Sequence, residues 1–99
     1  MRRTFQFHPQ ARSEFLDAIA YYEEHGQGLG TAFNEEVRTS IDQVITNPWI
    51  GARYKAGTRR VLLRRFPFYL IYSVQAEVVT IIAVAHQRRR PGFWNRRTR

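Results

Sequence analysis

The sequence predicts a single α+β domain in which a helix hairpin packs on a small, mainly antiparallel sheet, in the order β-α-α-β-β-β. Two observations predict this class: apolar residues recur at helical spacing in the first half of the chain and at a spacing of two in the second. Ninety-nine residues suffice for one hydrophobic core. We therefore assign residues 1–99 to one domain that ends in a short basic tail.

The first half of the chain contains a short strand and two helices. Residues 3–7 alternate between apolar and polar, as in a strand with one wet face. Pro9 suits the first turn of a helix, and the helical pattern that follows ends near His25. The pattern returns from Phe33 and stops at Asn47-Pro48. The glycine-rich stretch between the two helices follows a helix rather than a strand, so we interpret it as a hairpin turn and not as a phosphate-binding loop.

The second half is rich in β-forming residues. Residues 49–58 have no clear period and predict a loop, whereas the runs 59–65, 68–75 and 78–86 predict three strands. In the last run both sets of alternate residues are apolar, which is typical of a strand covered on both faces. We expect that strand to be central and to lie under the helices. After Pro91 we expect a short helix with a frayed polar end.

Several function classes are excluded by composition. The chain has no cysteine, so disulfides, thiolate catalysis and cysteine-based zinc sites are absent, and a reducing compartment, the cytoplasm, is expected. The basic N-terminus leads into polar residues rather than the apolar stretch of a signal peptide. The apolar runs 66–72 and 78–85 are too short to span a bilayer, so we expect no membrane partner.

Metal and paired-carboxylate chemistry are not indicated. His8, His25 and His86 lack the spacing of metal ligands, so we expect neither a metal nor another cofactor. Glu23-Glu24 and Glu35-Glu36 are adjacent residues on helices, and adjacent side chains on a helix point apart. These carboxylates are therefore poor candidates for acid–base catalysis.

Positive charge is concentrated in the second half of the chain. Residues 1–50 carry four basic groups and seven acids, a net charge of −3; residues 51–99 carry twelve basic groups and one acid, a net charge of +11. Eleven of those twelve are arginines, whose planar guanidinium can bind a phosphate or carboxylate through two hydrogen bonds. An anionic macromolecular partner is therefore expected.

Seven of the arginines form two blocks, one in the run 59–65 and one directly after the last strand. We expect the sheet to bring the blocks together into one exposed electropositive patch, with Phe93 and Trp94 close by. The alternative is that these charges only keep the protein soluble. Arginine and aromatic side chains together can stack on bases or bind an acidic peptide. The arginines are Arg59, Arg60, Arg64, Arg65, Arg88, Arg89 and Arg90.

A set of short motifs runs through the second half. It consists of Gly57-Thr58-Arg59, Arg65-Phe66-Pro67-Phe68, Tyr72, Ala83-Val84-Ala85-His86, and then Arg89, Pro91, Trp94 and Arg97. Together these motifs resemble the RelE/ParE toxin superfamily, and ParE-type members most closely. The resemblance extends over nearly the whole chain, including Tyr21-Tyr22 in the first helix and the helix end at Asn47-Pro48.

The resemblance implies a toxin of a bacterial type II toxin–antitoxin module, a class linked to plasmid stabilization and growth inhibition. Such a toxin is held inactive by a cognate antitoxin, whose flexible segment wraps around it in a hetero-oligomer. Folding of that segment on binding buries about 1,000–3,000 Å². Arginines beside an apolar hairpin suit an acidic amphipathic segment.

Two activities occur in the superfamily. ParE-type members inhibit DNA gyrase, whereas RelE-type members cut mRNA on the ribosome, in some cases with a tyrosine near the C-terminus as general base. Trp94 stands about where that tyrosine would be, and an indole donates a hydrogen bond but cannot accept a proton. We therefore expect an inhibitor of gyrase rather than an enzyme. Under the RelE-like alternative, the catalytic candidates are Lys55, Arg59, His86 and Arg89.

Under the first interpretation, one set of residues forms the surface that engages antitoxin, target or both: Arg59, Arg65, Arg88, Arg89, Trp94, Arg96 and Arg97. A second set shapes the sheet beneath it: Phe66, Pro67, Tyr72 and His86. A third interpretation, a basic nucleic-acid-binding module, requires only the charge and predicts an affinity that falls steeply with salt.

Overall fold

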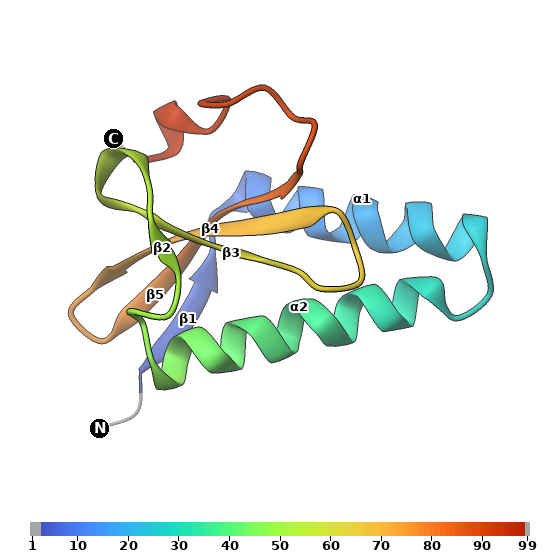
Figure 1. Ribbon diagram of the computed structural model, residues 1–99, viewed down its shortest axis with the longest axis horizontal. Coiled ribbons are helices and arrows are strands. Elements are labelled where there is room, and N and C mark those ends of the chain that lie inside the picture. The colour runs from blue at the N-terminus through green and yellow to red at the C-terminus, as the bar shows by residue number, and fades with distance from the viewer. Residues whose placement is uncertain (1–2, 99) are drawn as a thin grey trace.

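The computed structural model describes residues 3–98, which form two helices, a five-stranded sheet and a C-terminal segment (Figure 1). The helices α1 (Pro9–His25) and α2 (Leu29–Thr46) pack side by side on one face of the sheet. The C-terminal segment, residues 87–98, passes over the opposite face. The predicted α+β class, with a helix hairpin on a sheet, is confirmed.

The sheet is mainly antiparallel. Its strands are β1 (Thr4–Phe7), β2 (Ala52–Arg53), β3 (Arg59–Leu62), β4 (Phe68–Gln75) and β5 (Val78–His86). They lie in the order β1-β5-β4-β3-β2, in which only β1 and β5 run parallel. The predicted bounds of β4 and β5 are confirmed, and β5 lies inside the sheet, between β1 and β4.

The glycine-rich stretch is a turn between helices, as predicted. Gly28 has a φ of +85°, which favours glycine. The carboxylate of Glu23 accepts hydrogen bonds from the N–H groups of Gly28 (3.1 Å) and Gly30 (3.0 Å), which start α2. A Cβ at Gly30 would lie 2.7 Å from the carbonyl oxygen of Ile19, so this glycine allows the two helices to approach closely. The turn therefore serves helix packing.

Two apolar clusters lie on opposite faces of the sheet. The larger one joins both helices to residues such as Leu70, Tyr72 and Ile81. The smaller one contains Trp94 of the C-terminal segment, packed on sheet residues that include Ile71. The prediction that the last strand is covered on both faces is confirmed, because β5 supplies residues to each cluster.

Two expectations about local structure are wrong, and a third is confirmed only in part. The strand predicted over 59–65 ends at Leu62. The N–H groups of Arg64 and Arg65 instead donate to the carboxylate of Glu36 on α2, and this contact replaces strand pairing. The loop predicted over 49–58 contains β2 and a 3₁₀ turn, Lys55–Gly57. The short helix expected after Pro91 is a 3₁₀ turn, Asn95–Thr98.

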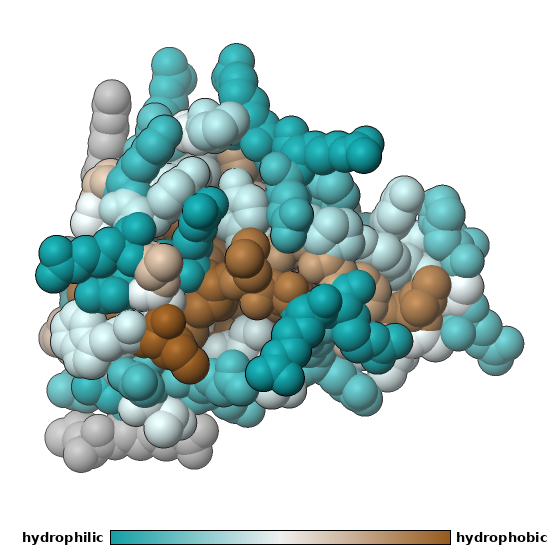
Figure 2. Space-filling model, in the orientation of Figure 1, coloured by the Kyte–Doolittle hydropathy of each residue, from teal (hydrophilic) through white to brown (hydrophobic). Residues whose placement is uncertain are grey.

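Apolar side chains also reach the surface between β3 and α2. Figure 2 shows brown side chains across the middle of this view, in the region where Figure 1 places those two elements. Leu62 is 61% exposed, and Ile50, which follows α2, is 50% exposed. Neither helix within residues 3–98 carries the long apolar stretch that crossing a bilayer requires.

Candidate binding surface

The arginines of β3 point to opposite faces of the sheet. Side chains alternate along a strand, and Val61 packs against the cluster under the helices. Arg59 pairs with Tyr72, which belongs to that same cluster. Arg60 therefore points to the opposite face, where its guanidinium lies over the rings of Tyr54 (4.7 Å) and Tyr69 (5.6 Å).

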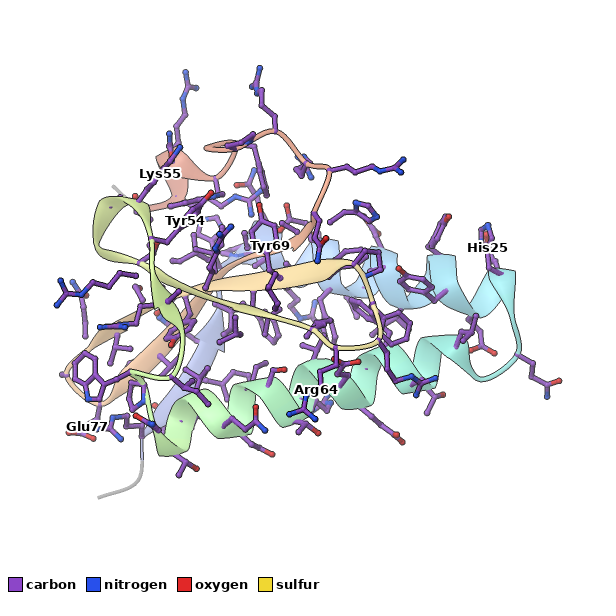
Figure 3. The ribbon with its side chains drawn as sticks, viewed as in Figure 1. His25, Tyr54, Lys55, Arg64, Tyr69 and Glu77 are labelled. Carbon is purple, nitrogen blue, oxygen red and sulfur yellow. The ribbon has the colours of Figure 1, made fainter. Side chains whose placement is uncertain are left out.

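Arg60 and Arg89 lie close together on the face of the sheet that is opposite the helices. Both line a shallow pocket of about 310 Å³, together with Tyr54, Leu62, Tyr69, Gln87 and Pro91. Arg89 stacks over the ring of Phe93 at 4.1 Å. Figure 3 labels Tyr54, Lys55 and Tyr69, which lie near one another at this end of the molecule. We call this site the Arg60–Arg89 pocket.

The tyrosine at the base of this pocket stays protonated over the neutral range. Burial raises the pKa of Tyr69 above its usual value near 10, and the neighbouring Tyr54 raises it further. The charges of Arg60 and Arg89 act in the opposite direction but are weaker than burial. The phenol is therefore a hydrogen-bond donor and a poor base at neutral pH.

Arg59 anchors a loop rather than lining this pocket. Its guanidinium donates to the carbonyl oxygen of Gly51 at 2.8 Å and lies over Trp49 at 5.2 Å. The hydroxyl of Tyr72 holds the same loop, because it donates to the carbonyl oxygen of Pro48 (2.7 Å) and accepts from the N–H of Gly51 (3.0 Å). Arg59 and Tyr72 thus position the loop between α2 and β2.

Arg97 does not belong to an exposed surface, contrary to the expectation from sequence. Its side chain is 8% exposed, and it donates to both carboxylate oxygens of Glu14 on α1, at 2.9 Å each. It also donates to the carbonyl oxygen of Ile82 (3.0 Å). Arg89 lies 3.7 Å from the same carboxylate but stays about half exposed. Arg97 therefore fastens the C-terminal segment to the first helix.

Trp94 is also not a surface residue. It is fully buried against the sheet, with its ring 5.7 Å from that of Tyr54. Within residues 3–98 its indole N–H has no hydrogen-bond partner. The indole is therefore not exposed where we expected it to contact a partner, because it packs on the apolar face of the sheet.

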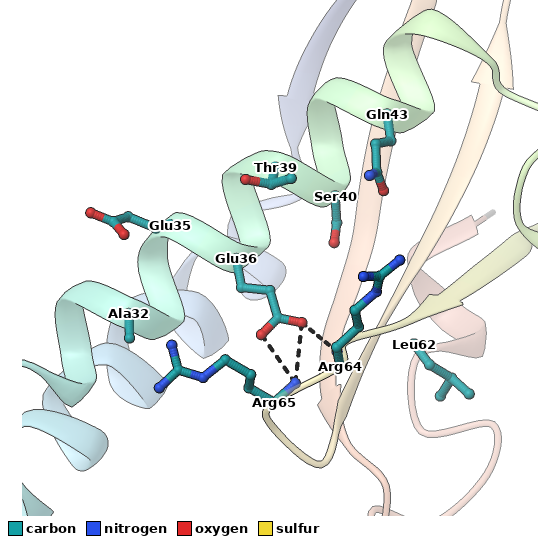
Figure 4. Close-up of a pocket in the computed structure, with 9 residues that line it drawn as sticks. All are labelled: Ala32, Glu35, Glu36, Thr39, Ser40, Gln43, Leu62, Arg64 and Arg65. Atoms are coloured by element: carbon teal, nitrogen blue, oxygen red, sulfur yellow. Dashed lines mark hydrogen bonds between the residues drawn. The ribbon is translucent and has the colours of Figure 1, made fainter.

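The remaining candidates are spread over the molecule. Arg88 and Arg96 are exposed on the C-terminal segment. Arg65 is exposed in the turn after β3, where it lines a groove beside α2 (Figure 4). The single patch expected from sequence is therefore wrong in part: Arg60 and Arg89 converge, whereas Arg59 and Arg65 lie elsewhere.

Of the residues expected to shape the sheet, Tyr72 lies within β4, and the other three lie where β4 begins and β5 ends. Phe66 is buried in the larger cluster, whereas Pro67 is exposed and its carbonyl oxygen accepts from the N–H of Gln87 (2.8 Å). The ring of His86 meets Phe68 edge-on at 5.2 Å. Its Nδ1 accepts from the N–H of Arg88 at 3.0 Å. Within residues 3–98, no three His, Asp or Glu side chains gather as a metal site would require.

Comparison with known protein families shows the family to which this chain belongs. The model of the ParE toxin of type II toxin–antitoxin systems, parDE, matches residues 5–91. The chain belongs to this ParE toxin family. Membership implies a cognate antitoxin as partner. A search of curated proteins found no match to the sequence of this toxin.

Two solved structures share the fold of this ParE family member. The chromosomal ParDE toxin–antitoxin system from P. aeruginosa is 16% identical, with a TM-score of 0.64, and the match covers 86% of this chain and 96% of that chain. A mutant of the E. coli toxin RelE in the free state is 20% identical, with a TM-score of 0.65, covering 89% and 86%. These likenesses show the fold.

The RelE-like catalytic set is dispersed in this ParE family toxin. His86 and Arg89 border a hollow of about 640 Å³ beside α1. Arg59 points to the helix side of the sheet, and Lys55 is exposed on the 3₁₀ turn; neither lines that hollow. The four residues do not form one site.

The sequence interpretation missed Tyr54 and Tyr69 and left Arg60 out of the binding set. Alternation along 59–62 carried the signal for Arg60, because an apolar Val61 in the core places Arg60 on the other face. No local signal marks Tyr54 or Tyr69, since their partners lie in distant parts of the chain.

Proposed function

We propose that this protein is a growth-arresting toxin that inhibits DNA gyrase, and that the Arg60–Arg89 pocket with its exposed neighbours engages the target. The convergence of Arg60 and Arg89 over Tyr54 and Tyr69 supports the proposal. A guanidinium held between aromatic rings is a rigid donor that is suited to a protein interface.

The composition of the pocket favours inhibition over RNA cleavage. General acid–base catalysis needs groups that exchange protons near neutral pH. Among the described residues that line the pocket, the titratable ones are arginines and tyrosines. Burial raises the pKa of Tyr69, and the buried indole of Trp94 cannot accept a proton.

The antitoxin segment is proposed to bind in the groove between α2 and the turn after β3, which adjoins the Arg60–Arg89 pocket at Leu62. This groove has a volume of about 390 Å³, and Arg64 and Arg65 border it (Figure 4). Exposed Leu62 lies in the groove, and exposed Ile50 lies near one end of α2. Glu35 and Glu36 line the same groove, and Glu36 accepts from the N–H groups of Arg64 and Arg65. An amphipathic segment therefore fits with its apolar side on Leu62 and its acidic side chains at the two guanidinium groups.

Gyrase supercoiling in the presence of the purified protein tests the proposal. We expect inhibition at micromolar protein, and we expect Arg60→Gln to raise the required concentration by about tenfold or more. Arg38→Gln removes the same charge from the outer surface of α2 and should leave inhibition unchanged. Intact supercoiling combined with cleavage of ribosome-bound mRNA would replace the proposal with the RelE-like alternative.

A further inference from the structure

Opposite layers of the molecule carry opposite charge. The hairpin of α1 and α2 holds seven acids and two arginines, a net charge of −5. The C-terminal segment, on the other face of the sheet, holds five arginines and no acid between residues 87 and 98. An approaching polyanion is therefore attracted to one layer and repelled by the other, which orients its docking.

Most of the cations on the C-terminal side have no intramolecular counter-ion. In residues 3–98 the ion pairs are those of Glu14 with Arg89 and Arg97. The other arginines of the segment are exposed, as is Lys55 on the adjacent turn. Contact between Tyr54 and Trp94 holds this turn beside the segment. Long hydrophilic side chains extend from this end of the molecule in Figure 2. We call the following set the basic face: Lys55, Arg60, Arg88, Arg89, Arg90 and Arg96.

The basic face presents guanidinium groups and not bare aromatic rings. Arg60 covers Tyr54 at 4.7 Å, and Arg89 covers Phe93 at 4.1 Å. Trp94 is buried beneath the segment. Proteins that bind single strands stack unpaired bases on free ring faces. The described surface offers hydrogen-bond donors for phosphate instead, and a duplex displays regularly spaced phosphates on its outside.

We infer that the basic face binds the phosphate backbone of duplex DNA directly, without base specificity. Each arginine that reaches a phosphate releases condensed counter-ions, so the affinity falls as salt rises. The acidic helix layer lies on the other face of the sheet and is directed away from the duplex. The inference concerns the toxin and DNA alone and holds whether or not gyrase is the target.

Fluorescence anisotropy of a short labelled duplex of mixed sequence tests the inference, with salt varied between about 50 and 200 mM. The double substitution Arg90→Gln with Arg96→Gln removes two exposed cations of the basic face. We expect it to weaken binding and to make the negative slope of log affinity against log salt less steep by about 1.8. The matched control, Arg12→Gln with Arg38→Gln, removes the same charge from the helix layer and should leave the slope unchanged.

Three outcomes would overturn the inference. An equal loss in both double variants would mean that net charge alone drives binding. Tighter binding of the matching single strand than of the duplex would mean that the protein stacks unpaired bases on its aromatic rings. Binding of poly-glutamate at least as tight as that of the duplex would mean that the face fits an acidic protein. A protein that inhibits supercoiling but does not bind the duplex would contradict only this inference and leave the proposed function standing.

Discussion

Glu14 of α1 accepts two hydrogen bonds of 2.9 Å from the guanidinium of Arg97, 83 residues further along the chain. The same carboxylate accepts from the N–H of Val84 at 3.1 Å. β1 pairs with β5 only as far as Ile81, so the next part of β5 has a free edge on that side. Glu14 and Arg97 supply hydrogen-bond partners for this edge, since Arg97 also donates to the carbonyl oxygen of Ile82. The pair thereby joins the helix layer to the C-terminal segment.

Loss of the Glu14 carboxylate should destabilise the fold. Glu14→Gln leaves the Arg97 guanidinium, which is 8% exposed, without its counter-ion. Removal of one partner from a largely buried pair lowers the free energy of unfolding by about 3 kcal/mol. Urea unfolding followed by circular dichroism measures the loss. Glu24→Gln is the control, since Glu24 is an exposed acid of α1, and equal midpoints for the two variants would show that the pair contributes nothing.

Repeating patterns in the sequence predicted most of the fold. The helical period placed α1 and α2, and the continuous apolar pattern placed β5 with a cover on both faces. Whether a given arginine is buried or exposed was not predictable, because that depends on contacts between distant segments of the chain. Arg96 and Arg97 are adjacent residues of the same type. Arg97 is largely buried and paired with Glu14, whereas Arg96 is exposed. Trp94 was misplaced for the same reason, since no local pattern shows that it packs on the sheet.

The two tryptophans should report opposite environments. Trp94 is fully buried and Trp49 is 67% exposed. In Trp49→Phe only the buried indole emits, so the fluorescence maximum should shift to shorter wavelength and acrylamide should quench it weakly. Trp94→Phe should show the reverse. Strong quenching in Trp49→Phe would mean that the C-terminal segment does not pack on the sheet.

The hydroxyl of Tyr72 should stabilise the loop after α2. It donates to the carbonyl oxygen of Pro48, and its loss leaves the buried N–H of Gly51 without an acceptor. Tyr72→Phe should therefore lower the free energy of unfolding by about 1–3 kcal/mol. Chemical denaturation measures the change, and Tyr21→Phe is the control because Tyr21 is 54% exposed. A Tyr72→Phe midpoint equal to that of the wild type would contradict this role.

High pH should destabilise the protein through its buried tyrosines. Burial raises the pKa values of Tyr22, Tyr69 and Tyr72 above their usual value near 10. Above that value the unfolded chain loses phenolic protons before the folded one does, so the folded state binds more protons. The free energy of unfolding should therefore stay level below about pH 10 and fall as the pH rises through the folded pKa values.

Two measurements check the effect of pH. Tyrosinate absorbance should show a group of phenols that ionise above pH 10, together with unfolding. Denaturant titrations across the same range should give a smaller fall for Tyr69→Phe than for the wild type, because that substitution removes one raised pKa. A free energy of unfolding that rises between pH 10 and pH 11 would mean that the folded state releases phenolic protons more readily than the unfolded chain, and would exclude burial as the dominant influence on these groups.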